Sequence, residues 1–318
     1  MIPRFIKHNL DHTKCDPMFS CPQVSLIEDS IPSITAMKKN FHKIYESSKA
    51  EENHSKSSNS VRIATYNVHY WTDLYEKPSF DKILKDIAII NADILCLQEV
   101  SFDRTKFNPY NYDQLMGKFR DMGYCDYVEV YGSQYLGSRF GNLILSRCKM
   151  DNKLWGTLHK GNVKVRRGYC LASFKDLNVD VCCVHLDVFD ESGDTRRKQL
   201  EEMLKLVSAP RENLIICGDF NSIRKQDYEP KRLNTIINHD HLRGIVTDTQ
   251  TLQKLDELNY KTSFEHAQKK SDCTVWSCRA IDHIFIHSNC PYKIVKSEIH
   301  YTINSDHFAI YADINKLV

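Results

Sequence analysis

Residues 213–221 read NLIICGDFN, a short apolar run that ends in Asp219 and Asn221. An apolar run of this length between turn residues predicts a strand buried on both faces. Residues 92–100, ADILCLQEV, repeat the arrangement and end near Glu99. A buried strand leaves the side chains at its carboxyl end little positional freedom. These polar residues are therefore candidates for a site at one edge of a sheet.

Polar residues end apolar runs at three other places in the chain. TYN ends at Asn67, CVH ends at His185, and the late segment SDH contains Asp306 and His307. Carboxylates gathered at the ends of buried strands repel one another and lose hydration unless a cation lies between them. Carboxylate and amide oxygens are hard ligands that suit Mg²⁺ or Mn²⁺ better than Zn²⁺. We expect a divalent-cation site, with Mg²⁺ as the cofactor and Mn²⁺ as its substitute.

Short apolar runs alternate with helical patterns along the chain. Helical spacing of apolar residues predicts helices over residues 80–90 and 195–207. The remaining runs predict strands, at residues 61–69, 141–147, 169–175, 178–186, 281–287 and 308–314. Such a mixture predicts an α/β layered domain with sheets inside and helices outside.

The domain organisation follows from one break in this pattern. Residues 47–60, SSKAEENHSKSSNS, contain six serines and no large apolar residue, which predicts a linker. Residues 33–46 could form one short amphipathic helix before it. We therefore expect an N-terminal extension over residues 1–60 and one catalytic domain over residues 61–318.

Composition excludes several classes of protein. The net charge of +2 excludes a histone-like basic protein, although it leaves a local basic groove possible. No apolar run approaches the length of a membrane span, and the N-terminus lacks a signal-peptide core. Cys96, Cys182, Cys183 and Cys217 lie inside apolar runs, as reduced core thiols do. We expect an intracellular protein, cytoplasmic or nuclear, that is a monomer.

Seven short motifs together resemble the endonuclease/exonuclease/phosphatase superfamily, to which DNase I belongs. Each motif is weak alone, but all occur in the family's order: TYN (65–67), LQEV (97–100), GNLILSR (141–147), CVHL (183–186), GDFN (218–221), IDHIFI (281–286) and SDH (305–307). The resemblance implies a DNase I-like four-layered α/β sandwich, in which two mixed β-sheets pack face to face between helices. It also implies a hydrolase of phosphoester bonds that uses a divalent cation, usually Mg²⁺.

The resemblance also implies roles for the polar strand ends. Glu99 resembles the metal-binding glutamate, and Asn67 the asparagine that supports metal and phosphate. Asp306 resembles a further metal-site carboxylate. Asp219 resembles the aspartate that orients and deprotonates the attacking water, and Asn221 would position that water or the phosphate.

Two histidines complete the implied catalytic set. His307 would contact a phosphoryl oxygen, with Asp282 as the carboxylate that fixes its tautomer. Adjacent residues of an extended segment point to opposite sides, so Asp306 should face the metal and not pair with His307. His185 matches the first histidine of the DNase I, sphingomyelinase and tyrosyl-phosphodiesterase branches, which argues against a specialised AP endonuclease.

Four other positions are secondary candidates for substrate binding. Arg196 and Arg197 fall in the first turn of a predicted helix, where cations oppose the helix dipole and a phosphate ligand would explain them. Trp276 could stack on a base or an aromatic leaving group, and Arg167 could reach the edge of the site. Tyr70 and Trp71 could line the site's mouth, whereas we expect His69 and His283 to be structural.

Three functions remain open at this point. The first is a metal-dependent phosphodiesterase acting on nucleic acid, either a nuclease or an enzyme near the 5′-tyrosyl-DNA phosphodiesterase branch, which GDFNSIRK (218–225) resembles. The second is a phosphoesterase for a small-molecule or lipid phosphate, although VWSCRAID (275–282) departs from the inositol-phosphatase motif. The third is a catalytically dead scaffold that acts through its N-terminal segment, and the intact polar set argues against it. Substrate specificity should lie in loops such as residues 100–140 and 224–275.

Overall fold

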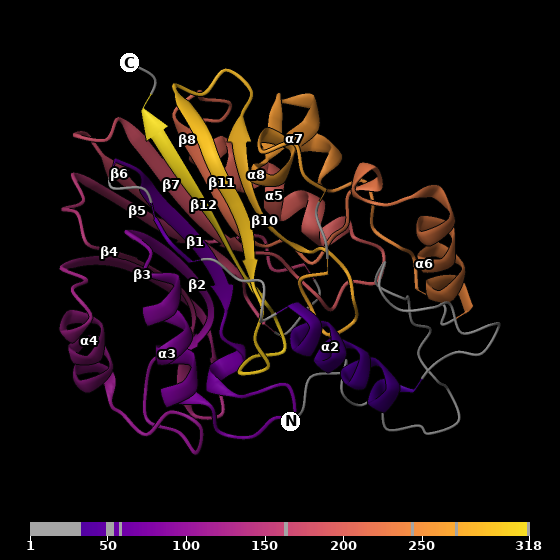
Figure 1. Ribbon diagram of the computed structural model, residues 1–318, viewed down its shortest axis with the longest axis horizontal. Helices are drawn as coiled ribbons and strands as arrows, with labels where there is room; N and C mark the ends of the chain where they lie inside the picture. The colour runs from indigo at the N-terminus through magenta and orange to yellow at the C-terminus, as the bar shows by residue number, and fades with distance from the viewer. Residues whose placement is uncertain are drawn as a thin grey trace.

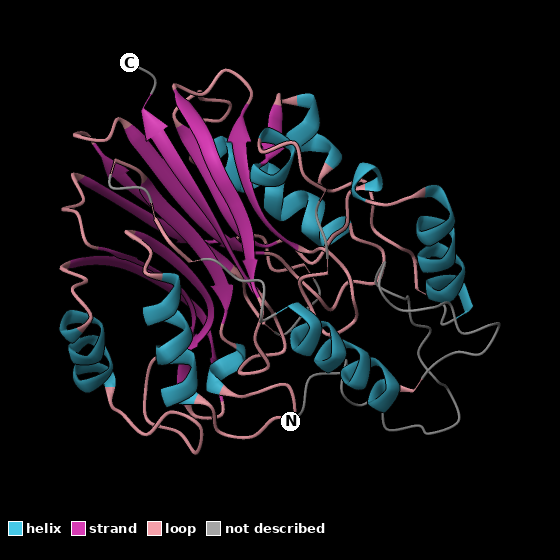
Figure 2. Ribbon diagram, in the orientation of Figure 1, coloured by secondary structure: helices cyan, strands magenta, loops and turns pink. Residues whose placement is uncertain are grey.

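Two six-stranded sheets pack face to face in the computed structural model of this protein, which describes residues 33–48, 54–56, 59–161, 165–242, 245–270 and 273–316 (Figure 2). In spatial order, the first sheet contains β11 (Tyr292–His300), β12 (Ala309–Lys316), β1 (Val61–Asn67), β2 (Ile94–Ser101), β4 (Ser138–Ser146) and β3 (Asp126–Tyr135). The second contains β5 (Asn152–Thr157), β6 (Gly168–Phe174), β7 (Val179–His185), β8 (Leu214–Asp219), β10 (Asp282–His287) and β9 (Tyr260–Thr262).

Helices cover the outer faces of both sheets (Figure 1). Apolar side chains of α3 (Phe80–Ile90) and α4 (Tyr112–Asp121) form one buried cluster with β1 and β2. Those of α5 (Asp194–Leu206) and α7 (Gln253–Glu257) form another with β7 and β8. A third cluster lies between the sheets and includes residues from both. These layers confirm the predicted DNase I-like α/β sandwich.

The strands and helices predicted from apolar patterns are present, with ends shifted by a few residues. The predicted loops 100–140 and 224–275 are a correction, because they contain regular elements as well. These are α4, β3, β9, α6 (Pro230–Leu242), α7 and α8 (Ser263–His266). Strand β5 was also missed, because it lies at a sheet edge and most of its residues are exposed, so it lacks a buried pattern. No helix in the described part of the chain is long and apolar enough to cross a membrane.

The N-terminal helix α2 (Ile34–Ser48) packs against the sandwich. Its Phe41 is fully buried and stacks on Phe308, with ring centroids 3.9 Å apart. Of the predicted linker, residues 49–53, 57 and 58 lie outside the described residues. The Arg62 guanidinium donates to the carbonyl oxygens of His54 and Ser55, which ties that part of the linker to β1. The division of the chain at residue 60 remains a prediction, with α2 in contact with the domain.

Candidate active site

The sheet topology brings the predicted polar residues to one edge of the sandwich. Strands β7 and β8 are parallel, so His185 and Asp219 lie side by side at their carboxyl ends. Strand β10 is antiparallel to β8, so its first residue, Asp282, lies directly opposite Asp219. In the other sheet, Asn67 ends β1 beside parallel β2. The Asn67 amide reaches across the sandwich and donates to Asp219 Oδ2 at 3.0 Å.

Asp219 lies at the centre of the cluster and is only 2% exposed. Its Oδ1 accepts the backbone N–H of Asn221 at 2.9 Å, and its Oδ2 accepts from Asn67, so the carboxylate is held in one orientation. Oδ2 also lies 3.4 Å from His185 Nε2 and 3.9 Å from His307 Nε2. Burial and the negative charge of Asp282 raise the pKa of Asp219 to about 7, against the opposing effect of His307.

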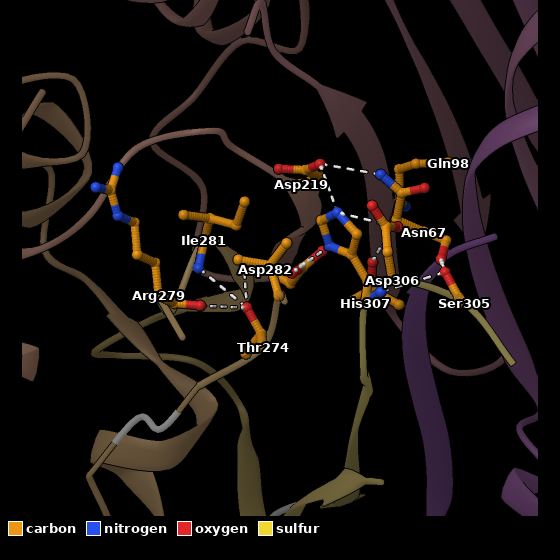
Figure 3. A network of polar contacts seen from close by, with 12 residues as sticks. Asn67, Gln98, Asp219, Thr274, Arg279, Ile281, Asp282, Ser305, Asp306 and His307 are labelled. Atoms are coloured by element: carbon orange, nitrogen blue, oxygen red, sulfur yellow. Dashed lines mark hydrogen bonds and ion pairs between the residues drawn. The ribbon is translucent and has the colours of Figure 1, made fainter. Parts of the chain in front are cut away.

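His307 is paired with Asp282, as the sequence predicted (Figure 3). Its Nδ1 lies 2.9 Å from Asp282 Oδ2, and both side chains are buried. Burial disfavours the charged ring, but the negative charges of Asp282 and Asp306 outweigh this and raise the pKa of His307 well above its ordinary value. Thr274 supports the pair, because its Oγ1 accepts the backbone N–H groups of Ile281 and Asp282 at 3.0 and 3.2 Å.

Asp306 departs from the expected arrangement. Its Oδ1 lies 3.8 Å from His307 Nε2, so the two side chains do not point to opposite sides. The reason is that residues 303–306 form a bend, and only from His307 does the chain pair as a strand, through an isolated bridge to Val275. The same oxygen lies 3.5 Å from His69 Nδ1. His69, which we expected to be structural, therefore lies at the site.

Glu99 is directed into the site by a bulge in β2. The pairing of β2 with β4 shifts register between Leu97 and Val100, and Glu99 has a left-handed φ of 57°. A bulge of this kind changes the direction of a side chain, and such conformations cluster at functional sites. Glu99 Oε1 lies 3.9 Å from His185 Nε2, on the same side as Asp219.

The donor atoms fit a hard divalent cation. Asp306 Oδ1 is buried and has no hydrogen-bond partner, and a buried carboxylate oxygen without a donor is costly unless a cation binds it. Glu99 supplies a second carboxylate. Asp219, Asp282 and His307 also offer three atoms within 4.8 Å of one another. Because His307 Nδ1 is occupied by Asp282, we interpret that group as hydrogen-bonded catalytic residues, and Glu99 and Asp306 as the candidate metal ligands.

His185 lies on the opposite side of Asp219 from Asp282 and has an arginine neighbour. The guanidinium nitrogen Nη1 of Arg167 lies 3.1 Å from His185 Nδ1. Burial, together with the positive charges of Arg167 and His307, lowers the pKa of His185 well below its ordinary value. The site therefore contains one histidine that favours the charged ring and one that favours the neutral ring.

The secondary candidates have other contacts. Arg196 is buried and its Nε donates to Asp248 Oδ2 at 2.8 Å, which gives the guanidinium a structural partner. Arg197 is paired with Asp194 in the first turn of α5. The Trp276 backbone N–H donates to the Asp306 carbonyl at 2.9 Å, while its ring is partly buried against two apolar clusters. Their expected contacts with substrate remain predictions.

Several residues that shape the site were not found from the sequence. The backbone N–H of His69 donates to Asn67 Oδ1 at 3.0 Å, which turns the Asn67 amide nitrogen toward Asp219. Ser305 Oγ donates to the Asn67 carbonyl at 2.7 Å and ties the SDH segment to β1. Gln98 Nε2 donates to Cys183 Sγ at 3.2 Å, across the two sheets. Gln98 and Ser305 lie inside the LQEV and SDH motifs, and His69 lies two residues after Asn67, but nothing in the sequence indicated these contacts.

Comparison with known proteins gives one family and one fold. The sequence model of the Endonuclease/Exonuclease/phosphatase family matches residues 64–307. No curated protein matches the chain. Among solved structures, an endonuclease/exonuclease/phosphatase from Beutenbergia cavernae is 16% identical with a TM-score of 0.63, covering 81% of this chain and 72% of that one.

Two other solved structures share the fold at similarly low identity. Humanised D. rerio TDP2 is 18% identical with a TM-score of 0.55, covering 81% of this chain and 100% of that one. The 3′–5′ exonuclease NExo from Neisseria meningitidis is 18% identical with a TM-score of 0.56, covering 80% and 100% of the two chains. At these identities the likeness shows the fold alone.

Proposed function

Because this chain belongs to the endonuclease/exonuclease/phosphatase family, it is a hydrolase of phosphoester bonds, and we propose that it uses Mg²⁺ to cleave phosphodiesters in nucleic acid. One observation carries the proposal. The buried carboxylate of Asp219, fixed by Asn67 and Asn221, lies beside a histidine that Asp282 holds in place. Glu99 and Asp306 lie next to this group, and one buried oxygen of Asp306 has no hydrogen-bond partner.

Asp219 is the proposed general base. Its orientation is set by two hydrogen bonds, and its pKa of about 7 suits proton transfer near neutral pH. It takes a proton from a water molecule as the water oxygen forms a bond to phosphorus. The bond from phosphorus to the leaving oxygen breaks, and that oxygen takes a proton from solvent. The products are a phosphomonoester and an alcohol.

The neighbouring residues stabilise charge on the phosphoryl oxygens. His307, which Asp282 keeps charged, can donate from Nε2. The Asn221 amide nitrogen, a second donor, lies 3.2 Å from His185 Nε2. Glu99 and Asp306 would hold the cation, with the Asn67 amide beside them. The bound cation would supply a positive charge at the phosphoryl group and orient it.

An aromatic cluster around buried Tyr70 lies next to the site, and its partly exposed members Phe107 and Tyr135 support nucleic acid as the substrate. The Tyr70 ring centroid lies 5.1 Å from that of Tyr135, 5.6 Å from that of Phe107 and 4.3 Å from that of His69. Aromatic rings near a phosphate site can stack on bases. Residues 69–71 all have left-handed φ values, so the turn that presents Tyr70 is strained.

We also propose the remaining features expected from the sequence. The protein is a monomer, and its catalytic unit includes residues 61–318. It works in the reducing interior of the cell. The buried cysteines Cys96, Cys182, Cys183 and Cys217 are free thiols, which supports a reducing compartment.

A substrate panel tests the proposal. The full chain should be assayed with Mg²⁺ and with EDTA on plasmid, abasic duplex, 5′-tyrosyl oligonucleotide, poly(A) and inositol phosphates. We expect cleavage of at least one nucleic-acid substrate in Mg²⁺ and none in EDTA, and Asp219→Asn should lose that activity. Turnover of inositol phosphates alone would instead support the small-molecule alternative.

A further inference from the structure

We infer that Arg167 is a positioning residue for His185, whose ring it holds with the proton on Nε2 and directed into the site. The inference rests on the proposed function, because it assigns the neutral N–H group that faces the phosphoryl oxygens. The sequence suggested only that Arg167 could reach the edge of the site, and the family match assigns it no role.

The contact between the two side chains determines the tautomer. Arg167 Nη1 lies 3.1 Å from His185 Nδ1. A guanidinium has only donors, so His185 Nδ1 must accept, and the proton of a neutral ring is then on Nε2. That nitrogen faces Asp219 Oδ2 at 3.4 Å and Glu99 Oε1 at 3.9 Å. His185 can therefore donate a hydrogen bond at the reaction site without carrying a charge.

Arg167 differs from the other buried arginines among the described residues because it has no carboxylate within ion-pair distance. Arg62, Arg196 and Arg224 each hold a carboxylate oxygen at 2.6 to 2.8 Å. Arg167 is 5% exposed, its side-chain hydrogen bond goes to His185, and its Nε has no hydrogen-bond partner. The positive charge of Arg167 acts to lower the pKa of Asp187, but the two side chains form no ion pair. A buried guanidinium without a carboxylate is costly, so a role at the site explains it better than fold stability does.

Close packing of the backbone around Arg167 places its side chain next to His185. A side chain at Gly132 would place its Cβ 2.2 Å from the Arg166 carbonyl oxygen, and one at Gly168 would place it 2.8 Å from Val130. These two glycines let the segment before β6 lie against the hairpin of β3 and β4. The Asn142 amide then donates to the Gly168 carbonyl at 2.9 Å, which fixes the segment.

One contact favours the opposite tautomer. The Asn221 amide nitrogen lies 3.2 Å from His185 Nε2, and a donor there would leave the ring proton on Nδ1, facing Arg167. The same amide nitrogen donates to the Leu186 carbonyl at 3.0 Å, so it has another acceptor. A guanidinium cannot become an acceptor, and Arg167 therefore decides the tautomer.

Nitrogen NMR on the full chain labelled with ¹⁵N-histidine tests the inference directly. Signals lost in His185→Gln identify the ring. In the wild type we expect an acceptor-type Nδ1 and a protonated Nε2. Arg167→Met should shift the ring proton from Nε2 toward Nδ1, because the donor at Nδ1 is lost. Arg167→Lys should keep the wild-type pattern because a donor remains. Arg166→Met is the control and should leave the pattern unchanged, because Arg166 is the exposed neighbour. Circular dichroism shows whether each variant is folded.

Kinetics on a cleaved oligonucleotide provide the second measurement. Arg167→Met should lower kcat about 10²-fold, the size expected for one lost preorganised donor, with a much smaller change in KM. Arg167→Lys should recover part of the loss. A wild-type Nδ1–H ring, an unchanged ring in Arg167→Met, or a variant that raises KM alone would overturn the inference. If no phosphoester is cleaved, the proposed function fails, and the spectra still decide whether Arg167 sets the tautomer.

Discussion

Replacing Phe41 with alanine tests whether the N-terminal helix is part of the catalytic unit. Phe41 is fully buried, and its ring stacks on that of Phe308 at 3.9 Å with an interplanar angle of 11°. Removing a buried phenylalanine costs about 3–5 kcal/mol, from lost transfer free energy and the remaining cavity. With a urea dependence of about 3 kcal/mol per M, the unfolding midpoint should fall by roughly 1–2 M.

Activity should fall as well, because Phe308 follows His307 directly. The Phe308 backbone N–H donates to the Thr274 carbonyl at 2.8 Å, and Thr274 also holds the backbone N–H of Asp282. Movement of Phe308 therefore loosens the pair formed by His307 and Asp282, and kcat should fall with little change in KM. Lys43→Ala, at an exposed position of α2, is the matched control. Equal unfolding midpoints for Phe41→Ala and Lys43→Ala would refute the packing of α2 on the domain.

Three further predictions follow from the charges at the site and in the core. Asp282→Asn should lower kcat about 10²- to 10⁴-fold. It should also move the alkaline limb of the kcat–pH profile to lower pH, because His307 loses the carboxylate that raises its pKa. An alkaline limb that does not move at saturating Mg²⁺ would contradict the pairing. Asp306→Asn should raise the Mg²⁺ concentration needed for half-maximal activity and leave that limb in place, as a Mg²⁺ titration at two pH values will show. Burial lowers the pKa of His283 to about 3, so the unfolded chain binds a proton at this residue first as the pH falls. From pH 7 to 5 this histidine alone therefore removes about 2 kcal/mol of stability, and urea unfolding at the two pH values should show His283→Gln losing about that much less than the wild type.

The sequence predicted the parts of the fold and site that depend on apolar patterns and strand order. Strand β8 and its terminal Asp219 follow from one buried run, and the position of Asp282 follows from the strand beside it. The strand and its terminal carboxylate depend on local hydrophobicity, which the sequence encodes directly. The pairing of His307 with Asp282 was instead implied by the family resemblance, and the structure forms it across the sandwich, because β10 and β12 belong to different sheets.

Other features depend on backbone geometry that no local pattern reports. The left-handed φ of Glu99 and the bend before His307 redirect side chains against the simple alternation of a strand. The approach of Arg167 to His185 needs close packing between segments far apart in the chain. Edge strand β5 was missed because its exposed residues carry no buried pattern.

The central claim is that Glu99 and Asp306 hold a divalent cation beside Asp219 for phosphodiester hydrolysis. The most direct test is the hydrolysis rate of bis(p-nitrophenyl) phosphate by the full chain after treatment with EDTA, measured during a Mg²⁺ titration. The account predicts no turnover in EDTA, saturable recovery with Mg²⁺, and a recovery curve displaced to higher Mg²⁺ in Glu99→Gln. Full activity in EDTA, or a Glu99→Gln curve that overlays the wild type, would contradict it.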